Sequence, residues 1–259
     1  MKQGSTRIPS VLITGGAKRI GAELARRFAK EGFKVAIHYN SSCEEAAALG
    51  AKLNATAKIC TILKADLRSR DGIGDLFNKA RDAVGEIDVC INNAAMFVND
   101  DVFDIDDKQF DDHLSVNVKA PVYLSALVAA QPEKADDRLV INLLDNKVFA
   151  INPDFFTYTL SKSALLTATH MMAMRFDGFP RVCGIAPSIT LISGKQSEEN
   201  FDKSSRLNPL HRRILPSDIA DAAIFIWKTK TYNNQIITID GGQTMWKLPR
   251  DVAFLTEKA

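Results

Sequence analysis

The segment Val11-Leu12-Ile13-Thr14-Gly15-Gly16-Ala17-Lys18-Arg19-Ile20-Gly21 contains a short apolar run, a glycine-rich turn and the beginning of a helical pattern. Apolar residues recur four positions apart at Ile20, Leu24 and Phe28, and Gly32 ends the pattern as a helix-capping residue would. The segment therefore predicts a buried strand that turns directly into a helix. In an open α/β sheet, such a turn lies beyond the carboxyl end of its strand, where ligands bind.

The same alternation of strand and helix continues along the chain. Further apolar runs predict strands at 35–37, 59–63, 87–91, 139–144, 182–186 and 236–239. Helical patterns lie between them, at 44–53, 71–84, 107–130 and 155–175. Continuous β-branched runs suit strands that are buried on both faces, and their alternation with helices implies right-handed crossovers. We therefore expect a single α/β domain over residues 1–259, with a doubly wound parallel sheet of about seven strands and helices on both faces.

One polar segment interrupts this alternation. Residues 188–213 carry several charges and continue neither pattern. A connection of this length is more often functional than plain, so we interpret it as a substrate lid. An inert surface loop is the alternative.

The composition is that of an ordinary globular protein. The chain is 46% apolar with a formal net charge of +2, and its Lys and Arg residues are scattered, which argues against a nucleic-acid partner. Residues 1–10 contain no apolar signal core, and no apolar run approaches the roughly 20 residues that span a bilayer. The four cysteines form no Cys-x-x-Cys pair and are expected to be reduced. We expect a cytoplasmic protein without membrane or metal sites.

The glycine-rich turn has the composition of a phosphate site. Glycines let the backbone approach a pyrophosphate, and a helix N-terminus supplies N–H groups and partial positive charge. Lys18 and Arg19 strengthen this interpretation, because cations at a helix N-terminus oppose the helix dipole by about 0.3–1 kcal/mol each unless an anion binds. We predict cofactor contacts from Gly15, Lys18, Arg19, Ile20 and Gly21. The spacing is not Gly-x-Gly-x-x-Gly, and a solvated basic turn is the alternative.

The end of the second predicted strand indicates which nicotinamide cofactor binds. The sequence there is His38-Tyr39-Asn40-Ser41-Ser42, without the acid that would hydrogen-bond the ribose 2′-hydroxyl of NAD. Hydroxyl and amide groups at Tyr39, Asn40, Ser41 and Ser42, with Arg19 nearby, suit the 2′-phosphate of NADP, unless these residues only form a turn. After the third strand, Asp66 and Leu67 are further candidates. Asp66 is expected to accept from the adenine amino group or to act as a helix N-cap.

Tyr158 and Lys162 are four residues apart, so on a helix they project from the same face. A Lys ammonium beside a Tyr phenol favours the phenolate, and we expect the pKa of Tyr158 to lie below its ordinary value of about 10. Such a phenol exchanges a proton near neutral pH, as general acid–base catalysis requires. An exposed pair without chemistry is the alternative. Asp145, thirteen residues before Tyr158, is the third catalytic candidate, with a strand-end cap as its alternative.

Taken in order, several motifs resemble those of the short-chain dehydrogenase/reductase family: Thr14-Gly15 to Gly21, Asn92-Asn93-Ala94-Ala95, Asn117, Tyr158-x-x-x-Lys162, Pro187 and Asp240-Gly241-Gly242. The resemblance covers about residues 9–242 and implies a Rossmann-like fold. It implies that Tyr158 donates a proton, that Lys162 lowers its pKa and binds the nicotinamide ribose, and that Asn117 holds a water in the proton relay. It also implies a homotetramer and cofactor contacts from Asn93, Ala94, Ala95, Pro187, Ser188 and Ile189.

Two departures narrow the resemblance. Asp145 stands where the family usually has Ser, and Arg19 where the glycine turn usually has Gly. At both positions the chain resembles the pteridine reductase branch of the family, which includes dihydrobiopterin and dihydromonapterin reductases. Phe97 matches the aromatic residue that stacks on the pterin there, with a core-filling loop residue as its alternative. Ala95 departs from the Ser that is common in that branch.

A carboxylate at position 145 has a physical rationale. A pterin offers amino and ring-nitrogen donors, which a carboxylate accepts, whereas a neutral hydroxyl suits a ketone oxygen. We therefore predict NADPH-dependent reduction of a dihydropterin, with Arg19, Phe97, Asp145 and Tyr158 as substrate-binding residues. The alternatives are an NADPH-dependent carbonyl reductase of the 3-oxoacyl type and a non-catalytic NADP-binding sensor.

The helix with Tyr158 is predicted to be apolar on more than one face. Phe155-Phe156, Leu165-Leu166 and Met171-Met172 are spread around it, whereas a helix buried only against its own sheet shows a single stripe. This pattern fits subunit packing, with a more enveloping core as the alternative.

Overall fold

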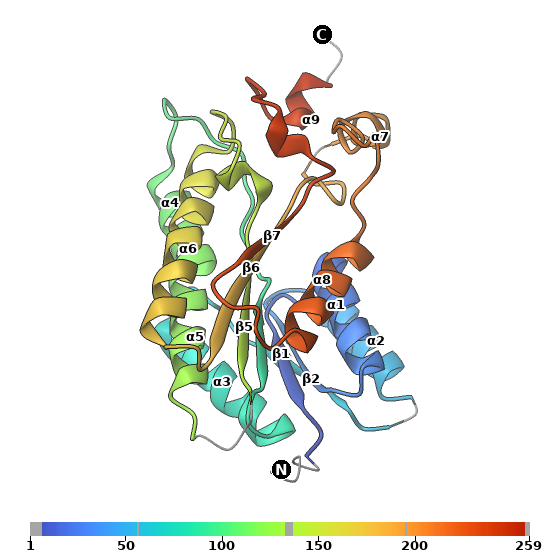
Figure 1. Cartoon of the computed structure of the whole chain (residues 1–259), viewed down its shortest axis with the longest axis vertical. Coiled ribbons are helices and arrows are strands. Elements are labelled where there is room, and N and C mark those ends of the chain that lie inside the picture. Colours follow the sequence, from blue (N-terminus) through green and yellow to red (C-terminus); the bar gives the residue numbers. More distant parts are fainter. Residues whose placement is uncertain (1–6, 56, 133–136, 195, 257–259) are drawn as a thin grey trace.

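The computed structural model describes residues 7–55, 57–132, 137–194 and 196–256. Within these ranges lies a parallel seven-stranded sheet in the order β3-β2-β1-β4-β5-β6-β7, with helices on both faces (Figure 1). Its strands are β1 (Ser10–Ile13), β2 (Lys34–Tyr39), β3 (Cys60–Lys64), β4 (Val89–Asn92), β5 (Leu139–Leu143), β6 (Arg181–Pro187) and β7 (Ile236–Ile239). The predicted fold class is confirmed. Residues 1–6, on which the prediction of no signal segment partly rests, lie outside the described ranges.

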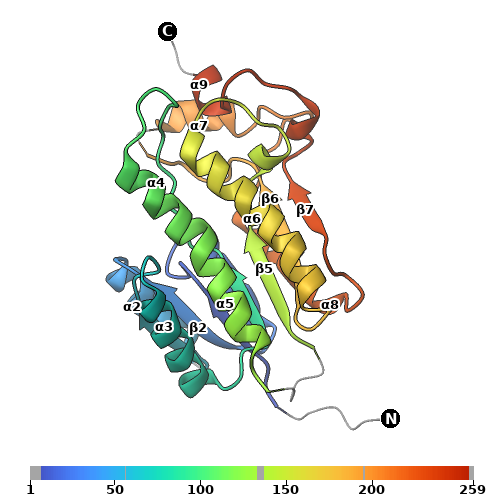
Figure 2. The same ribbon diagram turned by 90° about the vertical axis from the view of Figure 1, so that its left-hand side faces the viewer.

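Two layers of helices cover the sheet (Figures 1 and 2). One face carries α1 (Arg19–Lys30), α2 (Cys43–Leu53) and α8 (Pro216–Lys228). The other face carries α3 (Arg70–Val84), α4 (Asp107–Leu114), α5 (Ala120–Ala129) and α6 (Phe156–Arg175). No helix of the described residues is long and apolar enough to cross a membrane.

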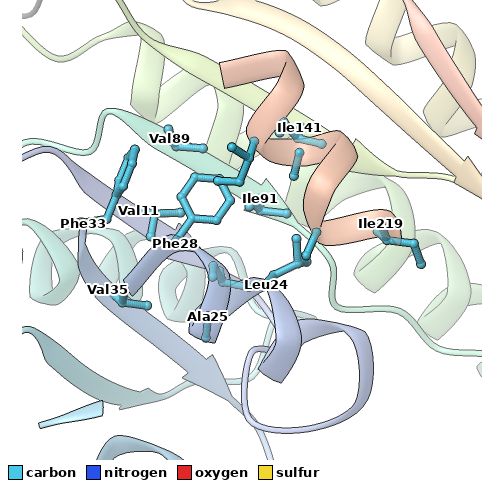
Figure 3. Close-up of a cluster of buried hydrophobic side chains, with 14 of the residues drawn as sticks. Val11, Leu24, Ala25, Phe28, Phe33, Val35, Val89, Ile91, Ile141 and Ile219 are labelled. Atoms are coloured by element: carbon cyan, nitrogen blue, oxygen red, sulfur yellow. The ribbon is translucent and has the colours of Figure 1, made fainter. Parts of the chain in front are cut away.

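The strands are rich in apolar residues because most of their side chains are buried on one face or the other. Val11 and Ile13 of β1 belong to the core beneath α1 and α8, whereas Leu12 belongs to the core beneath α3 and α5. Figure 3 shows the first core, in which Phe28 of α1 lies among strand side chains. Alternate residues of each strand point to opposite faces, so a strand between two helical layers has apolar residues on both faces.

The predicted helix at 107–130 is present but changes its winding in the middle. A π-helical turn, η1 (Ser115–Lys119), separates α4 from α5. In an α-helix the carbonyl of Asn117 would accept from the N–H of residue 121, but that residue is Pro121 and has no N–H. The proline therefore accounts for the wider turn, and the wider turn contains Asn117.

The carboxyl-terminal part holds most of what the sequence analysis missed. Helix α8 was not predicted, although Pro216 stands in its first turn and Asp218 accepts from the Leu215 N–H at 2.8 Å, which is a recognisable helix start. The predicted lid is not only loop, since it contains α7 (Glu198–Ser204). Two short elements follow β7, η3 (Gln243–Met245) and α9 (Val252–Leu255).

Helices α7 and α9 lie together beyond the carboxyl ends of the strands (Figure 1). The Asn200 side-chain amide of α7 donates to the Ala253 carbonyl at 2.8 Å and to the Thr256 hydroxyl at 3.0 Å. The predicted lid and the end of the described chain are thus joined at the edge of the sheet that carries the candidate site.

Candidate active site

A cavity of about 590 Å³ opens at the carboxyl edge of the sheet. Every predicted site residue except Asn117 lines it: Gly15, Lys18, Arg19, Ile20, Gly21, Tyr39, Asn40, Ser41, Ser42, Asp66, Leu67, Asn93, Ala94, Ala95, Phe97, Asp145, Tyr158, Lys162, Pro187, Ser188 and Ile189. Within the described residues, no group of three or more His, Cys, Asp or Glu side chains is placed to hold a metal ion.

At its glycine positions, the glycine turn has no room for side chains. Gly15 has φ +60°, and a Cβ on Gly21 would lie 2.2 Å from the Gly15 carbonyl oxygen. Asn93 after β4 fastens the turn, because its amide donates to the carbonyls of Thr14 at 2.8 Å and Gly15 at 3.0 Å. The turn and the end of β4 therefore form one rigid floor of the cavity.

His38 is a site residue whose role the sequence analysis missed. Its Nδ1 accepts from the Gly15 N–H at 3.1 Å and its Nε2 lies 3.2 Å from the Ala65 carbonyl. This pattern requires a neutral ring with the proton on Nε2. Burial lowers the pKa of His38 to about 4, which agrees with that state. The signal was its position at the end of β2, beside the glycine turn.

The first turn of α1 fits a phosphate group. Its N-cap residue is Lys18, whose side chain makes no capping hydrogen bond, and no acidic residue lies in the first turn. The first N–H groups of a helix have no intrahelical partner, and a bound anion would accept from them. The adjoining end of β2 presents Tyr39, Asn40 and the two serines to the cavity without a carboxylate among them, which fits an additional phosphate.

The Arg19 side chain is held against the segment that was predicted to be a lid. Its guanidinium donates to the carbonyls of Ile192 at 2.6 Å and Leu191 at 3.5 Å, which belong to the predicted lid. Lys18 lies beside the first turn of α2, where its Nζ is 3.8 Å from Glu45. Arg19 also has φ +56°, a left-handed conformation that favours glycine. The turn therefore keeps an arginine in strained backbone to connect α1 with the lid.

Asp66 is engaged by its own loop. Its carboxylate accepts from Arg68 side-chain nitrogens at 2.6 to 3.0 Å, and this partner lowers the pKa of Asp66. The alternative of a helix N-cap is wrong, because Ser69 caps α3 by accepting from the Gly72 N–H at 3.2 Å.

Asp145, Tyr158 and Lys162 come together at the carboxyl end of β5. The Tyr158 hydroxyl donates to Asp145 Oδ2 at 2.8 Å. Lys162 Nζ donates to the Leu143 carbonyl at 2.6 Å. Asp145 Oδ1 also accepts from the Lys147 N–H at 2.9 Å, so the residue caps the short helix η2 (Asn146–Val148) and binds the phenol at the same time.

The expected direction of the Tyr158 pKa shift is wrong. Burial, and then the charge and hydrogen bond of Asp145, raise the pKa of Tyr158 well above its ordinary value of 10. A carboxylate that accepts from the phenol stabilises its neutral form. Burial also raises the pKa of Asp145 and lowers the pKa of Lys162 to about 8. Burial and the acid at position 145 together make Tyr158 a phenol that holds its proton.

Asn117 is buried behind the cavity and not in its wall. Its side-chain amide donates to the Met96 carbonyl at 3.0 Å and to Ser161 Oγ at 2.9 Å, and its Oδ1 accepts from the Met96 N–H at 2.8 Å. The side chain therefore clamps the loop after β4 to α6. Its two amide hydrogens and its Oδ1 therefore have protein partners.

Phe97 presents a half-exposed ring to the cavity, so the core-filling alternative is wrong. The ring is 39% exposed. It stacks on Phe155 with centroids 4.4 Å apart and meets the Tyr158 ring edge-on at 4.6 Å. The aromatic ring and the Asp145–Tyr158 pair thus lie on one side of the same cavity.

The sequence analysis missed the polar end of this wall. Lys147, Asn152, Arg250 and Asp251 line the cavity together with Trp246, Leu248, Val252 and Ala253. Most of them lie beyond Gly242, where the motifs end, so no motif could find them. The Pro216 start of α8 and the apolar pattern after it were available, but nothing local predicts that 243–253 folds back over the strands.

The loop after β4 also orients the catalytic helix. Asp100 Oδ1 accepts from the Thr157 N–H at 3.0 Å, and Asn99 Oδ1 accepts from the Phe155 N–H at 3.2 Å. These contacts satisfy first-turn N–H groups of α6. The same loop therefore carries Phe97 and fixes the end of the helix that carries Tyr158.

The chain matches a family model described as short chain dehydrogenase over residues 9–203. It is similar to the crystal structure of FolM alternative dihydrofolate reductase 1 from Brucella canis complexed with NADP, with 36% identity, a TM-score of 0.86 and coverage of 93% of this chain and 96% of the other. The corresponding Brucella suis structure, also in complex with NADP, is 37% identical, with a TM-score of 0.84 and coverage of 93% and 98%.

Relatives of lower sequence identity are also described as oxidoreductases. The 3-oxoacyl-[acyl-carrier-protein] reductase FabG of Staphylococcus epidermidis is 25% identical over 91% of this chain and 99% of its own length. An uncharacterized oxidoreductase of Thermotoga maritima is 26% identical over 90% of this chain and 95% of its own.

Proposed function

The chain belongs to the short-chain dehydrogenase family of NAD(P)-dependent oxidoreductases, and from this premise we propose that it is an NADPH-dependent reductase of dihydropterins. The observation that carries the proposal is the 2.8 Å hydrogen bond between Asp145 and Tyr158, in a cavity that also presents the Phe97 ring. The likeness to two FolM structures supports it.

Several residues of the chain would hold the cofactor. The first-turn N–H groups of α1 bind the pyrophosphate, Tyr39, Asn40, Ser41 and Ser42 with Lys18 receive the 2′-phosphate, and Lys162 contacts the nicotinamide ribose. The two similar Brucella structures contain NADP, which supports this cofactor. When bound, NADPH supplies a hydride.

The substrate is a flat heterocycle. Phe97 offers one ring face to the cavity, and an aromatic face stacks well on a planar ring. The Asp145 carboxylate accepts from the amino and ring N–H donors of a pterin. Arg19, held by the lid carbonyls at 191 and 192, contacts both the substrate and a phosphate, and residues 188–213 act as the lid.

Tyr158 supplies the proton that accompanies the hydride. Reduction of a C=N bond places the hydride on carbon and a proton on nitrogen. The Tyr158 phenol lines the cavity, and its raised pKa keeps it protonated at neutral pH, so it has a proton to donate. The Lys162 ammonium supplies the replacement proton, and the Asp145 carboxylate orients the phenol. The family resemblance assigns a water in this relay to Asn117, whose side chain is engaged with Met96 and Ser161.

The test compares NADPH oxidation with a dihydropterin and with acetoacetyl thioesters. We expect kcat/KM to be at least 100-fold higher for the dihydropterin, and Asp145→Ser to remove most of this preference. A higher value for the thioester would favour the 3-oxoacyl-type reductase, which a FabG relative at 25% identity represents. NADPH binding without oxidation of any substrate would indicate a sensor.

A further inference from the structure

The end of the described chain forms part of the cavity wall. Residues 243–256, here named the C-terminal cap, contribute Gln243, Trp246, Leu248 and Arg250 to 253. The cap lies over the carboxyl ends of the strands beside α7 (Figure 1). None of the catalytic candidates belongs to it, so its contribution must be to shape the space around them.

A buried lysine connects the cap to the catalytic end of β5. Lys147 Nζ donates to Asp251 Oδ2 at 2.9 Å and to Asn152 Oδ1 at 2.8 Å, and it lies 4.9 Å from the Phe155 ring centroid. Its side chain is only 7% exposed and that of Asp251 is 16% exposed. A buried ion pair adds little net stability. Removing one partner is nevertheless strongly destabilising, because the other charge is then left buried without compensation.

The cap side of this connection is also well anchored. Asp251 Oδ1 accepts from the Ala253 N–H at 3.0 Å and so caps α9, while the Asp251 N–H donates to Asp154 Oδ2 at 2.6 Å. Asp154 binds Arg250 through both carboxylate oxygens, at 2.8 and 2.9 Å. Two adjacent ion pairs therefore join the cap to the segment between β5 and α6.

The same lysine contacts the catalytic acid through its backbone. Asp145 Oδ1 accepts from the Lys147 N–H at 2.9 Å, and Oδ2 accepts from the Tyr158 hydroxyl at 2.8 Å. Each carboxylate oxygen thus has one fixed donor. The orientation of Asp145 toward Tyr158 depends on where residue 147 is held, and the ion pair with Asp251 holds it.

We propose that Lys147 is a positioning residue, which through its ion pair with Asp251 fastens the C-terminal cap over the substrate end of the cavity and keeps Asp145 aligned with Tyr158. The kinetic consequences of this inference rest on the proposed function. Its structural consequence is independent of the proposed function, because the effect of this ion pair on the cap can be measured without any substrate.

The structural consequence is tested by hydrogen exchange on the full chain. In Lys147→Met and in Asp251→Asn, we expect amides of 246–256 to exchange at least 10-fold faster than in the wild type. The matched control is Lys228→Met, which breaks an exposed ion pair with Glu31 far from the cap and should leave these amides unchanged. Unchanged protection in both Lys147→Met and Asp251→Asn would overturn the proposal.

The kinetic consequence is tested with dihydropterin and NADPH. We expect KM for the dihydropterin to rise at least 10-fold in both variants, while Kd for NADPH stays within 3-fold of the wild type. Lys147→Arg keeps the charge and should restore most of the KM. Unchanged KM would overturn the positioning role, whereas absence of turnover in the wild type would overturn only the proposed function.

The pH profile separates positioning from a general loosening. The groups that act on Asp145 are Tyr158 and Lys162 from α6 and Lys147 from η2, Asp251 of the cap acts on Tyr158, and Arg19 lines the same cavity. Lys147→Met removes a cation, so the acidic limb of the kcat profile should move to higher pH. Asp251→Asn leaves the Lys147 cation uncompensated, so the acidic limb should move to lower pH. Shifts in one common direction would contradict the proposal.

Discussion

At the scale of single residues, Asp145 decides the chemistry of its neighbours. A phenol that donates to a carboxylate keeps its proton, so the tyrosine of this site differs from one that faces only a lysine. The lysine differs as well, because burial lowers the pKa of Lys162 to about 8. These shifts oppose the usual expectation for a Tyr/Lys pair. Burial is the main cause of both, and Asp145 adds to the shift of Tyr158.

The role of the phenol is tested by Tyr158→Phe. Because proton donation by a positioned side chain contributes about 10²–10⁴-fold, we expect kcat for dihydropterin reduction to fall by that factor. Calorimetry should find Kd for NADPH within about 3-fold of the wild type, since the backbone of the glycine turn is untouched. A parallel loss of binding and turnover would contradict the assigned role.

The effect of Asp145 on this phenol is directly measurable. Asp145→Asn removes the charge and the charge-assisted hydrogen bond, so the pKa of Tyr158 should fall relative to the wild type. Ultraviolet or ¹³C-tyrosine titration would follow it, with Tyr158→Phe identifying its signal among the four tyrosines. A Tyr158 pKa that rises in Asp145→Asn would show that another group controls the phenol.

His38 should leave a signature in the pH dependence of stability. Its pKa is about 4 in the folded protein and ordinarily 6.5, so the unfolded chain binds more protons between these values. The free energy of unfolding should therefore rise from pH 4 to 6.5, with about 3 kcal/mol from this residue. Urea unfolding at several pH values should give a free energy of unfolding that rises less steeply with pH in His38→Gln than in the wild type. An equal slope would mean that His38 titrates normally.

At the scale of elements, the sequence predicted what is local. The seven strands follow from apolar runs, and β7 was placed at 236–239 as observed. The first turn of α1 and the Tyr158–Lys162 spacing are likewise set by neighbours in the chain. Features that depend on contacts between residues distant in the sequence were not predictable. Examples are the fold of 243–256 over the strands and the contact of Arg19 with the Ile192 carbonyl. The π-helical turn at 115–119 was predictable in part, because Pro121 was a visible signal in the sequence.

The glycine turn and α1 pack too closely for any side chain at Gly21. A Cβ there would lie 2.2 Å from the Gly15 carbonyl oxygen, whereas a Cβ at Gly74 in α3 meets nothing within 4 Å. Gly21→Ala should reduce stability by about 1–3 kcal/mol and weaken NADPH binding at least 100-fold. Gly74→Ala, the matched control, should increase stability by about 0.5–1 kcal/mol without changing binding. Equal effects of the two changes on Kd would refute this account of the turn.

At the scale of the whole molecule, α6 links the catalytic site to the outer surface. Its buried residues include Tyr158, Lys162, Leu165 and Met172. Leu160, Met171 and Met174 lie on the outer side and are 44%, 64% and 74% exposed. A second apolar stripe, on the outer side of a helix whose inner side is already buried, suits burial against another chain.

We propose that this stripe joins subunits of the homotetramer that the family resemblance implies. Light scattering should give a mass four times the 28.5 kDa chain for the wild type, and a lower mass for Met171→Lys combined with Met174→Lys. Ile8→Lys changes another exposed apolar residue, beside β1, and should keep the tetramer. A wild-type monomer would contradict the proposal.

The two ends of the described chain lie at opposite edges of the sheet (Figure 1). Arg7 binds Asp88 just before β4, whereas Thr256 accepts from Asn200 of the lid. A purification tag or fused reporter attached beyond Thr256 would consequently emerge at the entrance for reactants, and one attached before Arg7 would not. Expression plasmids intended for steady-state assays should therefore encode their affinity handle upstream of the first strand.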